Sequence, residues 1–178
     1  MTEAPVAEAM PREGRGTQAS SEQGNSRPTA WSEAQRRFAK GGWFWLATVR
    51  GDGAPHVVPV FAACAGMTFF VASKDTTRKS HHLDADGRCV LTHDAGDMHL
   101  IVEGTARKAT DDATLTRASE AFATVYDWPT RVSGGKLDAD YGAPTSGGPP
   151  YDVYEVTPTR AFGFPTDGES FTPTRWRF

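Results

Sequence analysis

The chain contains few cysteines, no long apolar run and little net charge. Cys64 and Cys89 are its two cysteines; they form no CxxC motif and lie in or beside apolar strand-like segments, so we interpret them as reduced core thiols of a cytoplasmic protein. No apolar run approaches the roughly 18 residues of a membrane-spanning helix, and the N-terminus has no hydrophobic segment typical of a secretory signal. The formal net charge of −3 argues against a nucleic-acid-binding protein, which is usually basic. We therefore expect neither a membrane nor a nucleic acid among its partners.

Large apolar residues are missing from residues 1–30. This segment contains no aromatic residue, Leu or Ile, but many Glu, Ser, Gly, Gln, Arg and Pro residues. Such a segment cannot bury enough apolar surface to offset the entropy lost on ordering, and we predict a disordered N-terminal tail. Residues 31–178 would then form one folded domain, because a chain of 178 residues with 38% hydrophobic content can build a sizeable core.

Short apolar segments separated by turn signals dominate the sequence after residue 31. Asp52-Gly53 is a typical hairpin signal, since a type I′ turn needs positive φ at both central residues. Pro59 lies inside the returning segment, which predicts an edge strand, a bulge or a ligand on that side of the strand. We expect strands at residues 43–49, 55–63, 67–72, 88–93, 98–108, 151–164 and 171–178. Six or seven strands with short hairpins and few helices predict a mainly β protein that forms a small antiparallel barrel.

Helices and one long loop complete the expected domain. Ser32 is a candidate N-cap of a short helix that runs to Lys40 and ends at Gly41-Gly42. Residues 111–126 carry apolar side chains at three- and four-residue spacing, which indicates a helix with one buried face. Residues 129–150 are rich in Gly and Pro, and we expect a long loop there that could serve as an active-site lid.

Hydroxyl and cationic side chains come together where residues 73–83 lead from a strand into another helix. Thr76 can cap this helix, and Arg78 and Lys79 add two adjacent cations near the positive end of its dipole. Backbone N–H groups at a helix start bind anions, and neighbouring cations strengthen that binding. The segment therefore predicts a phosphate-binding site. The alternative is that Arg78 and Lys79 simply face water.

Motifs for hydrolysis or metal binding are absent from the sequence. It contains no Gly-x-Ser-x-Gly motif, and its Ser, His and Asp residues have no order typical of a catalytic triad. None of the five histidines has HxxxH or HExxH spacing, so we expect no metal site. His56 could approach a ligand bound beside Val57-Val58, although a plain strand residue is the simpler interpretation.

The order of these segments resembles the pyridoxamine-5′-phosphate-oxidase-like split-barrel family, which includes flavin- and deazaflavin (F420)-dependent oxidoreductases. The resemblance covers about residues 33–178 and depends on the order and spacing of several short motifs. The matching motifs are Leu46-Ala47-Thr48-Val49, Asp52-Gly53-Ala54-Pro55, Val58-Pro59-Val60, Phe69-Phe70-Val71-Ala72-Ser73, Thr77-Arg78-Lys79-Ser80 with Leu83, Arg88-Cys89-Val90-Leu91, Val102-Glu103-Gly104-Thr105-Ala106 and Thr174-Arg175-Trp176-Arg177-Phe178.

The resemblance implies a split β-barrel that forms a homodimer and binds its cofactor in a groove at the dimer interface. Hydride transfer to or from a small-molecule substrate would belong to the cofactor, so no catalytic side chain is expected. Residues 58–60 would lie along the isoalloxazine edge, residues 71–73 would flank the ring and ribityl chain, and Arg78 and Lys79 would hold the phosphate. Trp176-Arg177 would close the site, within one chain or across the dimer, with a place in a core strand as the alternative. The expected cofactor-binding residues are Val58, Pro59, Val60, Val71, Ala72, Ser73, Thr77, Arg78, Lys79, Trp176 and Arg177.

Two cofactors, F420 and FMN, fit this resemblance. The oligoglutamate tail of F420 would favour a broad basic groove, to which Lys74 and Lys108 could contribute together with Arg78 and Lys79. The composition, with 14 Arg against 5 Lys, is typical of actinobacteria, where F420 is common. These observations favour F420 slightly over FMN.

Other functions of the same architecture remain as alternatives. True pyridoxine or pyridoxamine 5′-phosphate oxidases end in an Arg-Leu-x-Pro type segment, and the different ending at residues 174–178 argues against that substrate. A heme-binding protein, or a protein that sequesters a flavin or deazaflavin without turnover, would use the same groove. His56, His81 or His82 would then be a candidate axial ligand. His82 stands where family members commonly have Asn or Gln, so we assign it no contact with a flavin.

Overall fold

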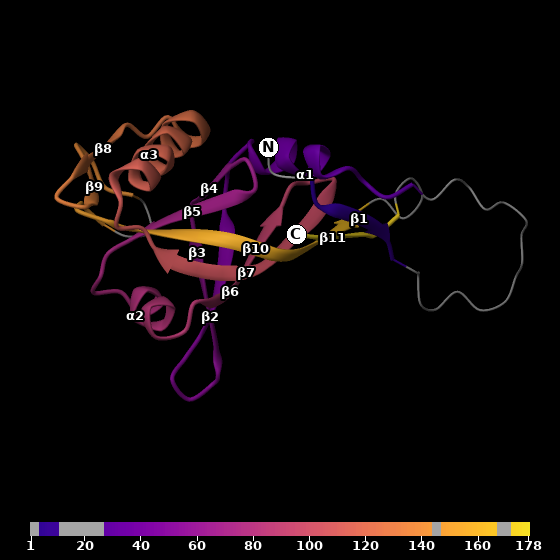
Figure 1. Ribbon diagram of the computed structural model, residues 1–178, viewed down its shortest axis with the longest axis horizontal. Coiled ribbons are helices and arrows are strands. Elements are labelled where there is room, and N and C mark those ends of the chain that lie inside the picture. Colours follow the sequence, from indigo (N-terminus) through magenta and orange to yellow (C-terminus); the bar gives the residue numbers. More distant parts are fainter. Residues whose placement is uncertain (1–3, 11–26, 144–146, 167–171) are drawn as a thin grey trace, which may run out of the picture.

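The computed structural model describes residues 4–10, 27–143, 147–166 and 172–178 (Figure 1). These residues form three helices and eleven strands, and every strand pair is antiparallel. The helices are α1 (Trp31–Phe38), α2 (Arg78–Ala85) and α3 (Asp112–Tyr126). The strands are β1 (Val6–Ala9), β2 (Phe44–Val49), β3 (Pro55–Val60), β4 (Ala62–Ala65), β5 (Thr68–Ser73), β6 (Arg88–Asp94), β7 (Met98–Lys108), β8 (Thr130–Ser133), β9 (Lys136–Ala139), β10 (Asp152–Pro165) and β11 (Thr174–Arg177). The protein is mainly β, as predicted.

One sheet of nine strands builds most of the molecule. Its neighbours run in the order β1, β11, β10, β7, β6, β2 and β3, while β4 pairs with β5 and β5 pairs with β10. The long strand β10 connects the two parts, because its first half lies between β7 and β5 and its second half between β7 and β11. The sheet is not closed, and this arrangement is a split barrel. Among the described strands β3 pairs with β2 alone, so Pro59 lies in an edge strand as expected.

Alternation along the strands places large side chains in two hydrophobic clusters. The larger cluster lies between α1 and the sheet and includes Trp31, Phe38 and Trp176. The smaller cluster lies beneath α3, whose Leu115 and Phe122 are fully buried on the stripe that the sequence predicts. In Figure 1, α2 lies near the end of the β2–β3 hairpin, away from both other helices. No helix in the described residues is long and apolar enough to cross a membrane.

Part of the predicted disordered tail is ordered. β1 pairs with β11 along its whole length. The backbone N–H of Thr29 donates to Thr174 Oγ1 at 2.9 Å, and the carbonyl of Thr29 accepts a hydrogen bond from Trp176 Nε1 at 2.9 Å. The prediction is therefore wrong for residues 6–9 and for Thr29, because backbone pairing with a sheet edge needs no large apolar side chain. Residues 1–3 and 11–26 lie outside the described part of the chain.

Two other local predictions need correction. The expected loop at 129–150 contains a hairpin of β8 and β9, whose turn at Gly134-Gly135 has the positive φ values of 58° and 73° that a type I′ turn needs. The first helix begins at Trp31 with Ala30 as its N-cap residue, so Ser32 lies inside the first turn instead of capping it.

Candidate cofactor-binding site

Hydroxyl groups hold the start of α2. Thr77 is the N-cap residue, and its Oγ1 accepts a hydrogen bond from the Ser80 amide at 3.3 Å, so the cap is Thr77 and not the expected Thr76. Ser80 Oγ donates to the carbonyl of Lys74 at 2.7 Å and lies 2.9 Å from Ser73 Oγ. Ser73 Oγ also lies 2.8 Å from Thr77 Oγ1. This buried cluster connects the end of β5 to the first turn of α2 and determines where the next side chains leave the helix.

The two cations that follow differ in their exposure. Arg78 is exposed to solvent, whereas only 6% of Lys79 is exposed. Burial lowers the pKa of Lys79, because desolvation disfavours the charged ammonium. A cation with little water around it attracts a nearby anion more strongly than a fully hydrated one does. The arrangement therefore suits an anion, and the alternative that both cations face water is wrong for Lys79.

Two histidines that are not among the expected cofactor-binding residues, His56 and His82, lie beside each other. The rings of His56 in β3 and His82 in α2 are 5.0 Å apart and nearly perpendicular. His82 Nδ1 lies 3.0 Å from Thr48 Oγ1. His56 Nδ1 is buried and has no hydrogen-bond partner among the described residues. The Asp52-Gly53 turn was a signal for this contact, since the hairpin that it predicts places His56 opposite Thr48.

An ion-pair network fastens α2 and the loop before it to the start of β10. Asp152 is 5% exposed, and its carboxylate lies 2.9 Å from Lys108 Nζ and 3.2 Å from Lys136 Nζ. Each lysine also pairs with a second carboxylate at 3.0 Å, Lys108 with Asp84 of α2 and Lys136 with Asp75 of the loop. Hydrogen bonds to these carboxylates raise the pKa of Lys108 and of Lys136. Lys108 already has two anionic partners, so we do not count it among the cations of a phosphate groove.

The expected residues of β3 lie at a free strand edge. Val58 is half-buried against the core, Pro59 is exposed, and Val60 is buried. Their strand pairs with β2 on one side, and no other described strand pairs with it. Such an edge leaves backbone polar groups that can pair with a ligand or with another chain.

The expected residues of β5 are much less accessible than those of β3. β5 lies between β4 and β10, and the exposed fractions of Val71, Ala72 and Ser73 are 0, 8 and 0%. The side chain of Val71 lies in the core and does not line an open surface. Of the three residues, the structure brings Ser73 next to the start of α2.

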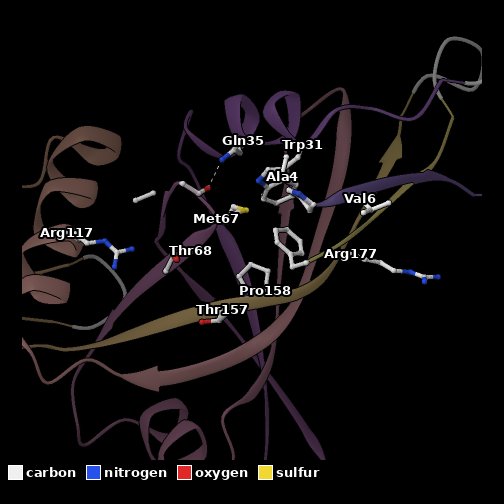
Figure 2. A pocket seen from close by; sticks show the side chains of 14 residues that line it. Ala4, Val6, Trp31, Gln35, Met67, Thr68, Arg117, Thr157, Pro158 and Arg177 are labelled. Carbon is white, nitrogen blue, oxygen red and sulfur yellow. Dashed lines mark hydrogen bonds between the residues drawn. The ribbon is translucent and has the colours of Figure 1, made fainter. Parts of the chain in front are cut away.

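Trp176 and Arg177, which we expected at the cofactor site, lie in another part of the fold. Trp176 is fully buried and contacts Trp31 edge-on with the ring centroids 5.5 Å apart, so it occupies the core position that we gave as an alternative. Arg177 lies 3.4 Å from Glu8 and lines a groove of about 940 Å³ between α1, the β4–β5 turn and β10. Figure 2 shows Trp31 and Met67 in this groove, with Arg177 at one end. The lining includes no residue of α2, so within one chain Trp176-Arg177 and Arg78-Lys79 do not form one site.

The open antiparallel barrel defines a protein of the split-barrel class. A sequence model of the pyridoxamine 5′-phosphate oxidase family matches residues 30–164. The chain belongs to this family.

Solved structures with a similar fold have low sequence identity to this chain. A conserved hypothetical protein from Mycobacterium tuberculosis is 16% identical, with a TM-score of 0.61 over 82% of this chain and 90% of that one. A NimC/NimA-family protein from Clostridium acetobutylicum is 17% identical, with a TM-score of 0.58 over 80% and 90%. A heme binding protein from Mycobacterium smegmatis is 18% identical, with a TM-score of 0.57 over 80% of this chain and 57% of that one. No curated protein sequence matches the chain significantly. At these identities the likeness extends to the fold alone.

Proposed function

We propose that this protein is an oxidoreductase that binds a phosphorylated flavin or deazaflavin and transfers hydride to or from a small organic substrate. The observation that carries the proposal is the buried cation Lys79 beside Arg78, at a helix start held by buried hydroxyl groups. The cofactor supplies the hydride chemistry when bound. The residues of this chain bind its phosphate at α2, orient its ring along the free edge of β3 and exclude water.

The arrangement of charge favours FMN over F420. F420 carries an oligoglutamate tail, which would favour an extended row of cations. Lys108 and Lys136 would extend the row beyond α2, but both are paired with carboxylates. The slight preference for F420 from the sequence counted Lys108 in this groove, and that support is lost. Arg78 and Lys79 are adjacent in the first turn of α2, and such a compact pair suits the single terminal phosphate of FMN.

Titration with FMN, F420 and riboflavin tests this proposal. Arg78→Ala and Lys79→Ala should each weaken FMN binding about ten- to a hundredfold, because a charge-assisted hydrogen bond contributes roughly 1.5–3 kcal/mol. Riboflavin binding should not change, since riboflavin has no phosphate. Arg36→Ala, on the exposed side of α1, is a charge-matched control that should bind FMN normally. Unchanged FMN affinity in the Arg78→Ala/Lys79→Ala double variant would refute the proposed site.

We further propose that the protein is a homodimer that associates through the outer face of the β2–β3 hairpin. Trp45 and Val57 are 52 and 54% exposed, and Pro59 lies opposite Trp45 on the same face. Trp43, 53% exposed, extends this apolar surface before β2. Soluble monomers rarely expose a contiguous apolar surface that includes two tryptophans. A second copy of the chain on this face would lie beside the β3 edge and could complete the cofactor groove.

Light scattering across micromolar concentrations tests the dimer. Trp45→Glu should convert dimers to monomers, because two carboxylates would be buried at a symmetric interface. Tyr141→Glu is the control, since Tyr141 is equally exposed but lies outside the hairpin. A wild-type protein that is monomeric throughout this concentration range would contradict the proposal.

A second candidate function is heme binding without turnover. His56 and His82 place two imidazole rings at the same end of the barrel, and one structural neighbour is a heme binding protein from Mycobacterium smegmatis. The absorption spectrum of protein purified from a host that contains FMN, F420 and heme separates the candidates, because their bands differ. A heme band that is lost in His82→Ala and kept in His81→Ala, whose side chain is exposed, would favour this second function.

A further inference from the structure

His56 occupies an incomplete polar environment. Its Nδ1 atom is buried and has no hydrogen-bond partner among the described residues, which is a costly state for a ring nitrogen. Its nearest ring neighbour is His82, 5.0 Å away, and His82 is itself held by Thr48. The backbone carbonyl of His56 accepts a hydrogen bond from Thr48 Oγ1 at 3.3 Å, so the same hydroxyl contacts both histidines. The geometry of the pair is therefore determined by the β2–β3 hairpin and not by the histidine side chains alone.

Positive charge faces His56 from two structural elements. Arg78 and Lys79 act on it from α2, and Arg50, which pairs with Asp52 at 3.0 Å, acts on it from the turn that joins β2 to β3. Desolvation first, and then the neighbouring His82, Arg78, Arg50 and Lys79, lower the pKa of His56, so the imidazole is neutral at neutral pH in the free protein. An anion among the same cations would cancel their effect, and it would itself favour the charged imidazolium.

We infer that His56 takes up a proton when this site binds a phosphomonoester, so that the His56–His82 pair recognises the dianionic phosphate of the cofactor. The inference rests on the proposed function, since it places that phosphate at Arg78 and Lys79. It goes further by adding a residue from β3 to the site and by naming the charge state of the ligand. A phosphodiester carries one negative charge and would drive the proton uptake less strongly. FMN should therefore be preferred over a cofactor whose phosphate is a diester.

The linkage between proton uptake and binding has a definite sign. A ligand whose binding adds a proton binds more tightly as the pH falls, with a limit of about tenfold per pH unit for one proton. The second ionisation of a phosphomonoester lies near pH 6, so between pH 7 and 8.5 the ligand stays dianionic. In this range FMN affinity should fall about three- to tenfold per pH unit in the wild-type protein. Riboflavin affinity should not depend on pH.

Calorimetric titration of the whole protein with FMN in two buffers of different ionisation enthalpy counts the protons directly. At pH 7.5 the wild type should take up a substantial fraction of one proton per FMN, and it should take up none with riboflavin. His56→Gln should bind FMN with little proton uptake and a flat pH profile, because glutamine can donate a hydrogen bond but does not titrate. His81→Gln is the matched control on the exposed side of α2 and should behave like the wild type.

The outcomes separate this inference from the function on which it rests. If FMN binds but the wild type takes up no proton, the inference is overturned and the proposed function stands. The same holds if His56→Gln takes up as many protons as the wild type, or if the uptake is lost in His82→Gln alone. If FMN and F420 both fail to bind, the proposed function and the inference fall together. Because the wild-type measurement needs no substitution, an absence of proton uptake overturns the inference even if His56→Gln folds poorly.

Discussion

Replacing Asp152 with Asn removes the carboxylate on which the ion-pair network of α2 converges. Asp152 is 5% exposed and lies between Lys108 and Lys136, at 2.9 and 3.2 Å from their ammonium groups. Asparagine preserves the shape of the side chain but not its charge. Lys108 would keep Asp84, and Lys136 would keep Asp75, each at 3.0 Å.

The expected loss of stability follows from these remaining contacts. Removing one partner of a fully buried ion pair costs about 3–5 kcal/mol. The lysine side chains here are 34 and 32% exposed and each retains a carboxylate, so we expect a smaller loss of about 2 kcal/mol. For a domain of this size, that loss corresponds to a fall in Tm of about 4–8 °C.

Thermal and urea unfolding, followed by tryptophan fluorescence, measure this loss. Asp138→Asn is the control, because Asp138 pairs with Arg131, whose side chain is 55% exposed. This substitution should lower the free energy of unfolding by less than about 1 kcal/mol. Lys108→Met should lower the free energy of unfolding less in the Asp152→Asn background than in the wild type, since the two residues share one interaction. Equal stabilities of Asp152→Asn and Asp138→Asn would show that the buried carboxylate does not hold α2 in place.

Three further changes test other parts of the structure. Thr77→Ala removes the N-cap hydrogen bond of α2 and should lower the free energy of unfolding by about 1 kcal/mol in urea titrations; a smaller loss than at an exposed threonine would contradict the cap. Gly163→Ala should cost about 1–3 kcal/mol in the same assay, because a Cβ atom there would lie 2.7 Å from the Trp176 ring; a neutral effect would show that the ring can move. Burial raises the pKa of Cys64 and of Cys89 to about 12, so the native protein at pH 8 should resist iodoacetamide, as mass spectrometry can check, and should react once it is unfolded. Rapid labelling of the native protein would show that these thiols are accessible.

Elements with local signals were predictable from the sequence. The three- and four-residue spacing of apolar residues marks α3, and the predicted Asp111–Tyr126 segment differs from Asp112–Tyr126 only because Asp111 is the N-cap residue. Asp52-Gly53 predicts the β2–β3 hairpin, and the expected strand at residues 98–108 is β7. These features depend on neighbours a few residues apart, and short-range physics determines them. The helix start before Arg78 belongs to the same group, although the cap is one residue later than predicted.

The remaining features depend on residues far apart in the chain, which a linear pattern does not bring together. β1 has too few apolar residues to be recognised as ordered, and its order comes from backbone pairing with β11 at the other end of the chain. Lys108 reads as a free cation until the fold places Asp84 and Asp152 beside it. The sequence by itself determined the β-rich architecture and the cationic helix start, because both arise from local propensity and spacing. Only the tertiary structure decided which lysines pair with carboxylates and which histidines lie together, because charge, burial and contact are properties of the folded surroundings.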